Sequence, residues 1–306
     1  MMKPLISVII AARNAQGTIR ACLDAVLKLD YPAFEVIVAD DGSTDGTLEI
    51  LRAYGAHVRV VALQHAGPSR ARNEAAALAK GEFLAFTDSD CIVDAGWLNE
   101  LLRCFGDVSV VAAGGLQKSP ADETVFGRRV QRFFAETGFV ADYARQRPGI
   151  YRAVHNPSCN SIYRAEAFRS AGGFWTGIWP GEDVELDHRL GRAGGRIMCN
   201  AAAVVCHYRQ STMSGFCRMM RRYGWAQAVL LRRHGFFRFV QCVPFLSVGM
   251  IAACAAWPLL LPLLMPAAVL FALVKRISWS TLCLLPAAWW HWHAGFAEGL
   301  FRSRVS

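Results

Sequence analysis

The chain of 306 residues carries a formal net charge of +9, and 54% of its residues are hydrophobic. This length suits one large domain or two modest ones, and the apolar content is high for a purely soluble protein. The charge is uneven, because residues 188–306 hold 14 bases and one acid while residues 1–187 hold 19 bases and 23 acids. Long apolar runs beside the C-terminal bases favour an anionic membrane surface over nucleic acid as the partner.

Neither a secretion signal nor a cysteine-based site is expected. The apolar segment at the N-terminus is too short for a signal core followed by a cleavage site. The ten cysteines are scattered without a Cys-x-x-Cys pair, which predicts neither a zinc site nor a disulfide framework. They are typical of small apolar residues in a reducing compartment.

The first 113 residues alternate between β-rich apolar segments and segments with helical spacing. We expect strands at 5–11, 34–39, 58–63, 82–87 and 108–113, and helices at 18–28, near 48–51, 69–80 and 95–104. This alternation predicts an α/β fold, with a Rossmann-like, mostly parallel sheet covered by helices on both faces.

Polar clusters follow three of these strands, and ligands bind at the carboxyl ends of strands in such sheets. Asp40 and Asp41 follow the second strand, residues 67–70 follow the third, and Asp88-Ser89-Asp90 follows the fourth. Two carboxylates one residue apart suit a divalent cation, which in turn binds phosphate oxygens. The alternative for each cluster is an ordinary polar turn.

The next 90 residues contain weaker patterns. We expect helices at 123–139, 165–171 and 182–193 and strands at 156–163 and near 204–208. Four acids, Glu182, Asp183, Glu185 and Asp187, crowd the start of the helix at 182. Acids at this position also stabilise the positive end of a helix dipole without any catalytic role.

Five segments in this order resemble the family 2 glycosyltransferases, which have the GT-A fold. The resemblance covers about residues 4–210. The matching segments are Ser7–Asn14, Val38–Thr47, Gly67–Asn73, Phe86–Asp90 and Gly181–Leu186.

The resemblance implies a role for each matched residue. The nucleotide-sugar donor is expected at Ala11, Arg13, Asp40, Asp41, Arg72, Asn73, Asp88 and Ser89. An Mg²⁺ or Mn²⁺ ion is expected at Asp88 and Asp90, with His207 as a further ligand. Asp183 matches the catalytic base, and Glu182 is expected to support it.

Each assignment has a structural alternative. Asp40 and Asp41 are also good turn and helix-capping residues, and Arg72 can simply cover a helix surface. Asn156 and Asn160 can line the acceptor pocket or cap a turn. A lone histidine such as His207 is more often structural than a ligand.

The residue types fit glycosyl transfer chemistry. A divalent cation offsets the charge that develops on the leaving diphosphate. A carboxylate on the opposite face of the sugar accepts the proton of the attacking hydroxyl, and one displacement inverts the anomeric centre. Retention in the analogous hydrolases requires a second, nucleophilic carboxylate.

The C-terminal third is basic and apolar. Residues 212–238 predict an amphipathic basic helix at an anionic membrane face, or alternatively a solvated basic face. Residues 239–274 carry no charge and would form about 54 Å of helix, too long for one crossing of a ~30 Å bilayer core. Three prolines, Pro258, Pro262 and Pro266, favour a hairpin of two short crossings, and 277–297 forms a third apolar segment.

Together these features predict a catalytic domain at 1–210, an interfacial helical region at 211–238 and membrane-embedded helices at 239–306. We expect an inverting, metal-dependent, non-processive glycosyltransferase at the cell inner membrane, facing the cytoplasm. Its expected partners are a nucleotide-diphosphate sugar and a lipid-linked or membrane-proximal glycan acceptor, with no nucleic acid.

Three alternatives remain open at this stage. The first is a polyprenyl-phosphate glycosyltransferase, whose acceptor is the phosphate itself. The second is a nucleotidyltransferase that uses the same Asp-x-Asp pair on a triphosphate. The third is a non-catalytic membrane scaffold subunit.

Overall fold

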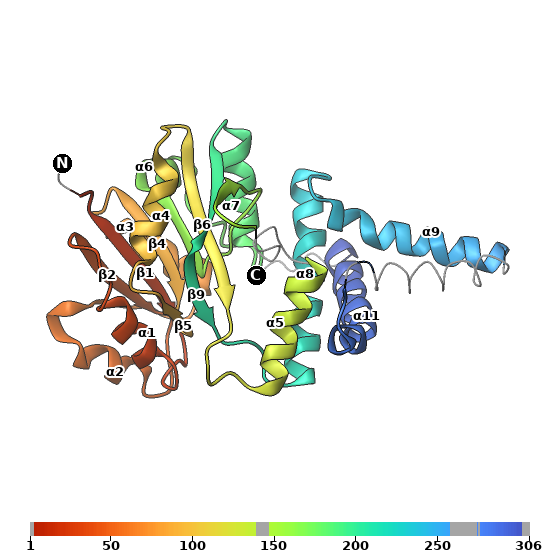
Figure 1. Cartoon of the computed structure of the whole chain (residues 1–306), viewed down its shortest axis with the longest axis horizontal. Helices are drawn as coiled ribbons and strands as arrows, with labels where there is room; N and C mark the ends of the chain where they lie inside the picture. Colours follow the sequence, from red (N-terminus) through yellow and green to blue (C-terminus); the bar gives the residue numbers. More distant parts are fainter. Residues whose placement is uncertain (1–2, 139–146, 258–273, 275, 302–306) are drawn as a thin grey trace. The chain divides into compact units, whose positions relative to one another are not determined.

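The structure of the protein is a computed structural model that describes residues 3–138, 147–257, 274 and 276–301. Two compact units make up the chain (Figure 1). The first contains residues 1–123 and 141–208, and the second contains 124–140 and 209–306. The segment around 124–140, which the sequence analysis placed in the catalytic domain, therefore groups with the C-terminal helices.

One mixed sheet organises the first unit. Its strands, among the described residues, are β1 (Ile6–Ala12), β2 (Phe34–Asp40), β3 (Arg59–Ala62), β4 (Phe83–Asp88), β5 (Cys91–Val93), β6 (Val110–Lys118), β7 (Ile150–Arg152), β8 (Asn160–Arg164) and β9 (Arg196–His207). The order is β3-β2-β1-β4-β8-β6-β9-β5, and β7 pairs with β9.

Strand directions confirm a mostly parallel sheet, with three exceptions. β1 pairs in parallel with β2 and β4, β2 with β3, and β6 with β9. β8 runs antiparallel between β4 and β6, and β5 and β7 run antiparallel to β9. The sequence analysis did not anticipate β5 or β7, and it expected only the last part of β9.

Helices cover both faces of this sheet, as expected (Figure 1). They are α1 (Ile19–Val26), α2 (Thr47–Ala53), α3 (Pro68–Ala77), α4 (Trp97–Leu102), α6 (Ala165–Ser170) and α7 (Glu182–Arg192). One core contains α1 and α4 with Ile6, Val8 and Ile10 of β1, whereas the other contains α3, α6 and α7 with Ile9. Alternate residues of a strand point to opposite faces, so β1 contributes to both cores.

The second unit is helical in its described part. It consists of α5 (Val125–Thr137), α8 (Met213–His234), a 3₁₀ turn at Phe239–Cys242, α9 (Val243–Ala256) and α11 (Trp279–Phe301). Buried side chains from α5, α8 and α11 form its core: Val130, Phe133, Phe134, Phe216, Met220, Ala228, Leu284, Ala288, Trp292 and Phe296. The apolar side of α8 is therefore covered by neighbouring helices, while its membrane-facing role remains a prediction.

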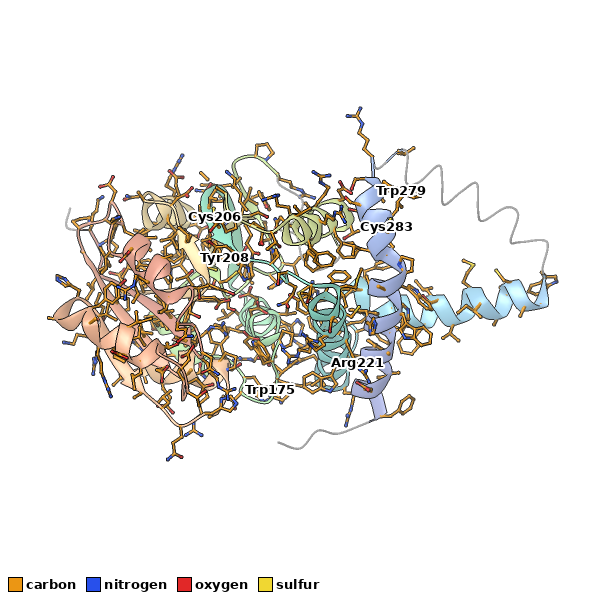
Figure 2. All side chains as sticks on the ribbon, turned by 90° about the horizontal axis from the view of Figure 1, so that it is seen from below. Trp175, Cys206, Tyr208, Arg221, Trp279 and Cys283 are labelled. Carbon is orange, nitrogen blue, oxygen red and sulfur yellow. The ribbon has the colours of Figure 1, made fainter. Side chains whose placement is uncertain are left out.

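Glycines allow α8 and α11 to pack closely. A Cβ atom at Gly224 of α8 would lie 1.9 Å from the Trp292 carbonyl oxygen, and one at Gly295 of α11 would lie 1.9 Å from that of Arg221. Arg221, labelled in Figure 2, donates from Nε to Oε2 of Glu298 at 3.0 Å beside this crossing. Small residues at a helix crossing let the two backbones approach, as in membrane helix pairs.

One helical stretch in the described part of the chain has the length and composition to cross a membrane, Phe239–Ala256. No residue of α9 is buried, and Phe245, Leu246, Val248 and Ile251 are exposed. The second limb of the expected hairpin, with Pro258, Pro262 and Pro266, lies outside the described residues. Helix α11 continues beyond the expected segment 277–297, to Phe301.

Candidate active site

The carboxyl ends of β1, β2 and β4 lie side by side and carry the first predicted site residues. The register pairs Ala11 with Asp88 across β1 and β4, and Ala12 with Asp40 across β1 and β2. The strands that follow β1 in the sequence first extend the sheet on one side, as β2 and β3, and β4 then lies on the other side of β1. Open α/β sheets bind ligands at the position where the strand order reverses in this way. The sheet thus brings Asp40 and Asp88 to one edge, as the sequence predicted, and Ala11 lies between them.

Asp40 and Asp41 bind the loops that surround them. Both are nearly inaccessible to solvent. Asp40 accepts hydrogen bonds from the backbone NH and the hydroxyl of Ser43. Asp41 accepts from the backbone NH groups of Ala66 (2.8 Å) and Gly67 (3.0 Å), so it holds the loop between β3 and α3.

A polar chain connects Asp41 to the exposed Arg13. His65 Nδ1 lies 2.8 Å from Asp41 Oδ2, and its Nε2 lies 2.9 Å from Nη1 of Arg13. Because the guanidinium can only donate, His65 accepts at Nε2 and donates from Nδ1 to Asp41. Arg13, Asp41 and His65 therefore form a cluster at this edge, and their contact with a nucleotide remains a prediction.

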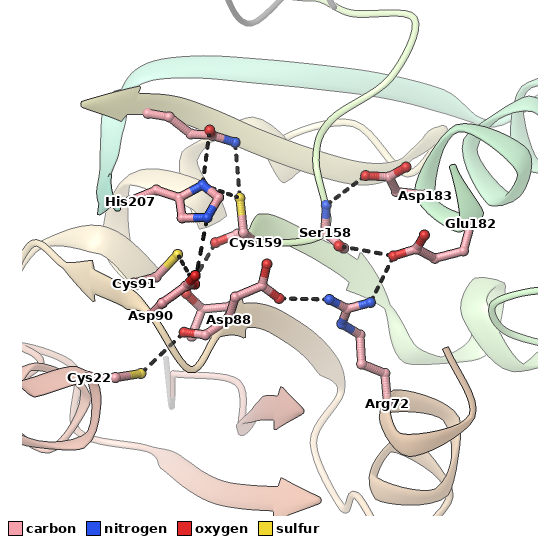
Figure 3. Close-up of polar contacts among 12 residues, drawn as sticks. Cys22, Arg72, Asp88, Asp90, Cys91, Ser158, Cys159, Glu182, Asp183 and His207 are labelled. Atoms are coloured by element: carbon pink, nitrogen blue, oxygen red, sulfur yellow. Dashed lines mark hydrogen bonds and ion pairs between the residues drawn. The ribbon is translucent and has the colours of Figure 1, made fainter. Parts of the chain in front are cut away.

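Arg72 joins two elements that are distant in the sequence (Figure 3). Its Nη2 lies 2.6 Å from Asp88 Oδ1 at the end of β4, and its Nη1 lies 2.8 Å from Glu182 Oε1 at the start of α7. Burial opposes the charge of Arg72, but the two carboxylates outweigh it and raise its pKa. The arginine is 3% exposed, so it positions Asp88 and Glu182 from within the protein.

Asn73 faces a different partner. Its side chain donates to the Phe174 carbonyl oxygen at 2.7 Å and accepts from the Phe174 NH at 2.9 Å. This pair of bonds fixes the loop after α6 against α3. A contact between Asn73 and the donor remains a prediction.

The two acids at the start of α7 have different surroundings. Gly181 precedes the helix with φ of 109°, a conformation that favours glycine. Glu182 is 3% exposed, and its burial, together with the nearby charge of Asp183, raises its pKa to about 7. Asp183 is only half-buried. Of the two, Asp183 is therefore the one that solvent or an acceptor can reach.

The segment 155–159 is held against α7. The Ser158 NH donates to Asp183 Oδ2 at 3.1 Å, and the Val184 NH donates to Asp183 Oδ1 at 2.7 Å. One turn further along α7, Asp187 Oδ2 accepts from the Asn156 NH at 2.8 Å. Backbone NH groups thus orient the Asp183 carboxylate, and the sequence analysis did not identify Ser158 in this role.

The two asparagines considered for the acceptor pocket are buried instead. Asn156 is 1% exposed and donates to the Met198 carbonyl oxygen, and Asn160 is fully buried. Asn160 donates to two carbonyl groups and accepts from Trp97 Nε1. Both side chains therefore connect strands and loops within the core.

A candidate cation site lies beside Asp88. Ligand atoms of Asp88, Asp90 and His207 lie within 4.8 Å of one another, and His207 Nε2 is 3.5 Å from Asp90 Oδ1. The pairing of β5 with β9 produces this arrangement, because Cys91 and His207 are cross-strand partners. Two carboxylates and an imidazole fit Mn²⁺, and the carboxylates also fit Mg²⁺. Ser89 lies half-buried between the two acids, and its contact with the donor remains a prediction.

His207 is also bordered by sulfur. Cys159 Sγ lies 3.9 Å from its Nδ1, and Gln117 Nε2 donates to the same sulfur at 2.9 Å. Burial lowers the pKa of His207, but Asp90 and Cys159 outweigh this and raise it to about 10. A hydrogen bond from Cys91 lowers the pKa of Cys159 to about 6. No spacing in the sequence indicates that Cys159 and Gln117 neighbour His207. Gln117 lies on β6, Cys159 lies just before β8 and His207 ends β9, so the pairing of these strands brings them together.

Comparison with known proteins agrees with this architecture. The sequence model described as "Glycosyl transferase family 2" matches residues 7–172, more than half of the chain. The pre-mycofactocin glycosyltransferase of Mycobacterium tuberculosis is 31% identical over 234 residues, which cover 75% of this chain and 48% of that protein. The chain thus spans about half the length of this relative.

A second relative matches over nearly the whole chain. The succinoglycan biosynthesis protein ExoA of Rhizobium meliloti is 28% identical over 291 residues, 89% of this chain and 88% of that protein.

Among solved structures, the mannosyltransferase PcManGT from Pyrobaculum calidifontis, in complex with GDP-Man and Mn²⁺, has a TM-score of 0.71. The match covers 98% of this chain and 88% of that one. Because the two sequences are only 20% identical, the match supports the fold and no shared substrate. The family model matches most of the first unit, and the fold agrees with that of a solved glycosyltransferase. This protein therefore belongs to glycosyl transferase family 2 and has a GT-A fold.

Proposed function

We propose that this protein transfers one sugar from a nucleotide-diphosphate sugar to a lipid-linked or membrane-proximal glycan, with inversion at the sugar carbon. The observation that carries the proposal is the bridge from Asp88 through Arg72 to Glu182. The bridge supports the proposal because it joins the end of β4, which carries Asp88, to the start of α7, where Asp183 follows Glu182 (Figure 3).

Charge in this region supports binding of a cation and a diphosphate together. Arg72 pairs with Asp88 and Glu182, Asp90 lies beside His207, and Asp183 accepts from backbone NH groups, so four acids face two basic side chains. A divalent cation bound at Asp88, Asp90 and His207 would neutralise charge on the leaving diphosphate. The mannosyltransferase with a similar fold is described in complex with GDP-Man and Mn²⁺, which favours this type of donor.

Arg72 and Asp183 have separate roles in the proposed reaction. Arg72 fixes the Asp88 carboxylate toward the cation site. Asp183, oriented by two backbone NH groups and half-exposed, accepts the proton of the acceptor hydroxyl as that oxygen attacks the sugar carbon. Only one accessible carboxylate is required at that point, since a single displacement inverts the centre.

The acceptor is assigned to a membrane pool on two grounds. The exposed apolar stretch Phe239–Ala256 suits a membrane anchor. The relative that matches along most of the chain is a succinoglycan biosynthesis protein. We place the protein at the cell inner membrane with its first unit in the cytoplasm, where nucleotide sugars are made.

A nucleotide-sugar screen tests the proposal on the full chain in detergent. With Mn²⁺ present, the donor at 100 times its dissociation constant should stabilise the fold by about 2.7 kcal/mol. Transfer should release a nucleoside diphosphate, and the product should have the opposite anomeric configuration by NMR. Release of pyrophosphate would instead identify a nucleotidyltransferase. Retained configuration would contradict the single displacement.

A further inference from the structure

Two buried thiols lie next to the candidate cation site. Cys91 is fully buried and Cys159 is 4% exposed. Ligand atoms of Cys91, Cys159 and His207 lie within 4.8 Å of one another. Proposed glycosyl transfer uses neither thiol, since a hard Mg²⁺ or Mn²⁺ ion prefers oxygen and nitrogen.

The geometry suits a soft metal ion. Zn–S bonds of about 2.3 Å and Zn–N or Zn–O bonds of about 2.0–2.1 Å place a sulfur ligand about 3.6 Å from a nitrogen or oxygen ligand around a tetrahedral ion. The corresponding separations in the structure are slightly longer, at 3.9 Å from Cys159 Sγ to His207 Nδ1 and 3.8 Å from Cys91 Sγ to Asp90 Oδ1. Small side-chain shifts therefore bring two thiolates, one imidazole and one carboxylate around a single ion.

We propose that Cys91, Cys159 and His207, with Asp90 as a fourth ligand, form a site for Zn²⁺ or another thiophilic divalent ion. Binding requires both sulfurs as thiolates and His207 as a neutral imidazole, so the protons that these three groups hold pass to solvent as two metal–sulfur bonds and one metal–nitrogen bond form, with no oxidation.

Zinc at this site inhibits the enzyme by competition. His207 and Asp90 belong to both sites, and the imidazole turns Nε2 toward Asp90 and Nδ1 toward Cys159. A zinc ion that engages these two residues removes them from the Mn²⁺ or Mg²⁺ site. This inhibitory consequence rests on the proposed function, whereas zinc binding itself does not.

Binding is tested on the full chain in detergent with a sulfur-free phosphine reductant, which keeps the cysteines reduced without adding a competing thiolate. Cobalt titration should give a thiolate-to-metal charge-transfer band, and zinc should displace the cobalt with one ion bound per chain. The variant Cys91→Ser/Cys159→Ser should lose the band and at least about tenfold in zinc affinity. The Cys91→Ala variant provides a second test if the double variant does not fold.

A matched control uses Cys104 and Cys199, two other buried cysteines of the same unit. Cys104→Ser/Cys199→Ser should keep both the band and the zinc affinity. Equal zinc affinity in the wild type and the Cys91/Cys159 variant would overturn the site.

Activity assays then test competition separately. Zinc should inhibit Mn²⁺-dependent transfer by the wild type, and excess Mn²⁺ should relieve the inhibition. Zinc binding without inhibition would overturn the competition. Zinc binding in a protein that transfers no sugar from any donor would contradict the proposed function and leave the metal site standing.

Discussion

Asp88 and Glu182 accept hydrogen bonds from the same guanidinium, that of Arg72, at 2.6 and 2.8 Å. Asp88 ends β4 and Glu182 begins α7, so this arginine joins the two segments that carry the candidate cation ligands and the candidate base.

Replacing Arg72 with Met should destabilise the first unit by about 3–5 kcal/mol, because two carboxylates lose their buried partner. Thermal unfolding of the full chain in detergent measures the change. Arg70→Met on the same helix is the control, since the Arg70 side chain is 61% exposed and pairs with Glu74 at 3.5 Å. Its effect should stay within about 0.5 kcal/mol. Similar melting temperatures for the two variants would contradict the role of Arg72.

Asp183→Asn should lower kcat by about 10²–10⁴-fold and leave donor affinity nearly unchanged, because a general base acts in the transition state. Steady-state kinetics and donor titration separate the two quantities. Glu166→Gln, an exposed acid on α6, should retain full activity. If the Asn variant remains fully active, Asp183 is not the base, and a phosphate acceptor, which needs little base catalysis, becomes the favoured assignment.

The charge of Glu182 should make stability depend on pH. Its pKa is raised from 4.5 to about 7 in the folded chain, so its stabilising contribution is complete below 4.5 and is lost as the pH rises through 7. Relative to Glu182→Gln, the wild type should lose stability across this range, by up to about 3 kcal/mol. Melting temperatures at pH 5 and pH 8 measure the stability difference between the wild type and Glu182→Gln. The same difference at both pH values would refute the raised pKa of Glu182.

His207→Ala should weaken Mn²⁺ binding by at least about tenfold, since the cation loses a nitrogen ligand. Manganese titration monitored by paramagnetic resonance measures binding without reference to activity. His57→Ala is the control, because His57 is exposed on the turn before β3. Equal Mn²⁺ affinity in all three proteins would limit the cation site to Asp88 and Asp90.

Gly224→Ala and Gly295→Ala should each destabilise the second unit, because the added methyl group overlaps a backbone carbonyl of the facing helix. Gly249→Ala on α9 is the control. Among the described residues, no heavy atom outside its own helix backbone and chain neighbours lies within 4 Å of its new Cβ, and alanine improves helix propensity by up to about 1 kcal/mol. Thermal unfolding should therefore rank the Gly249 variant at or above the wild type and the other two below it.

Local patterns sufficed to predict the first half of the sheet. β1, β2 and β4 are mostly apolar segments, of which β2 ends in Asp40 and β4 in Asp88, and parallel pairing with β1 brings these two ends together. The placement of Asp40 and Asp88 at one edge followed from this rule alone.

Non-local pairing set the rest of the site, and local patterns do not encode it. β5 has three residues, and only its pairing with β9 positions His207 beside Asp90. Gln117 approaches His207 from β6, and Cys159 approaches it from the loop before β8. Only the last part of β9, near 204–208, was expected as a strand, because the preceding Asn200-Ala201-Ala202-Ala203 consists of residue types that are depleted in strands.

The helical unit is discontinuous in sequence, since α5 precedes 141–208 and the other helices follow. Truncation after Tyr208 would therefore leave α5 attached to the α/β unit, with Val130, Phe133 and Phe134 deprived of their partners on α8 and α11. Such a fragment should aggregate. A crystallisable catalytic fragment requires a second cut, in which a short flexible linker replaces 124–140.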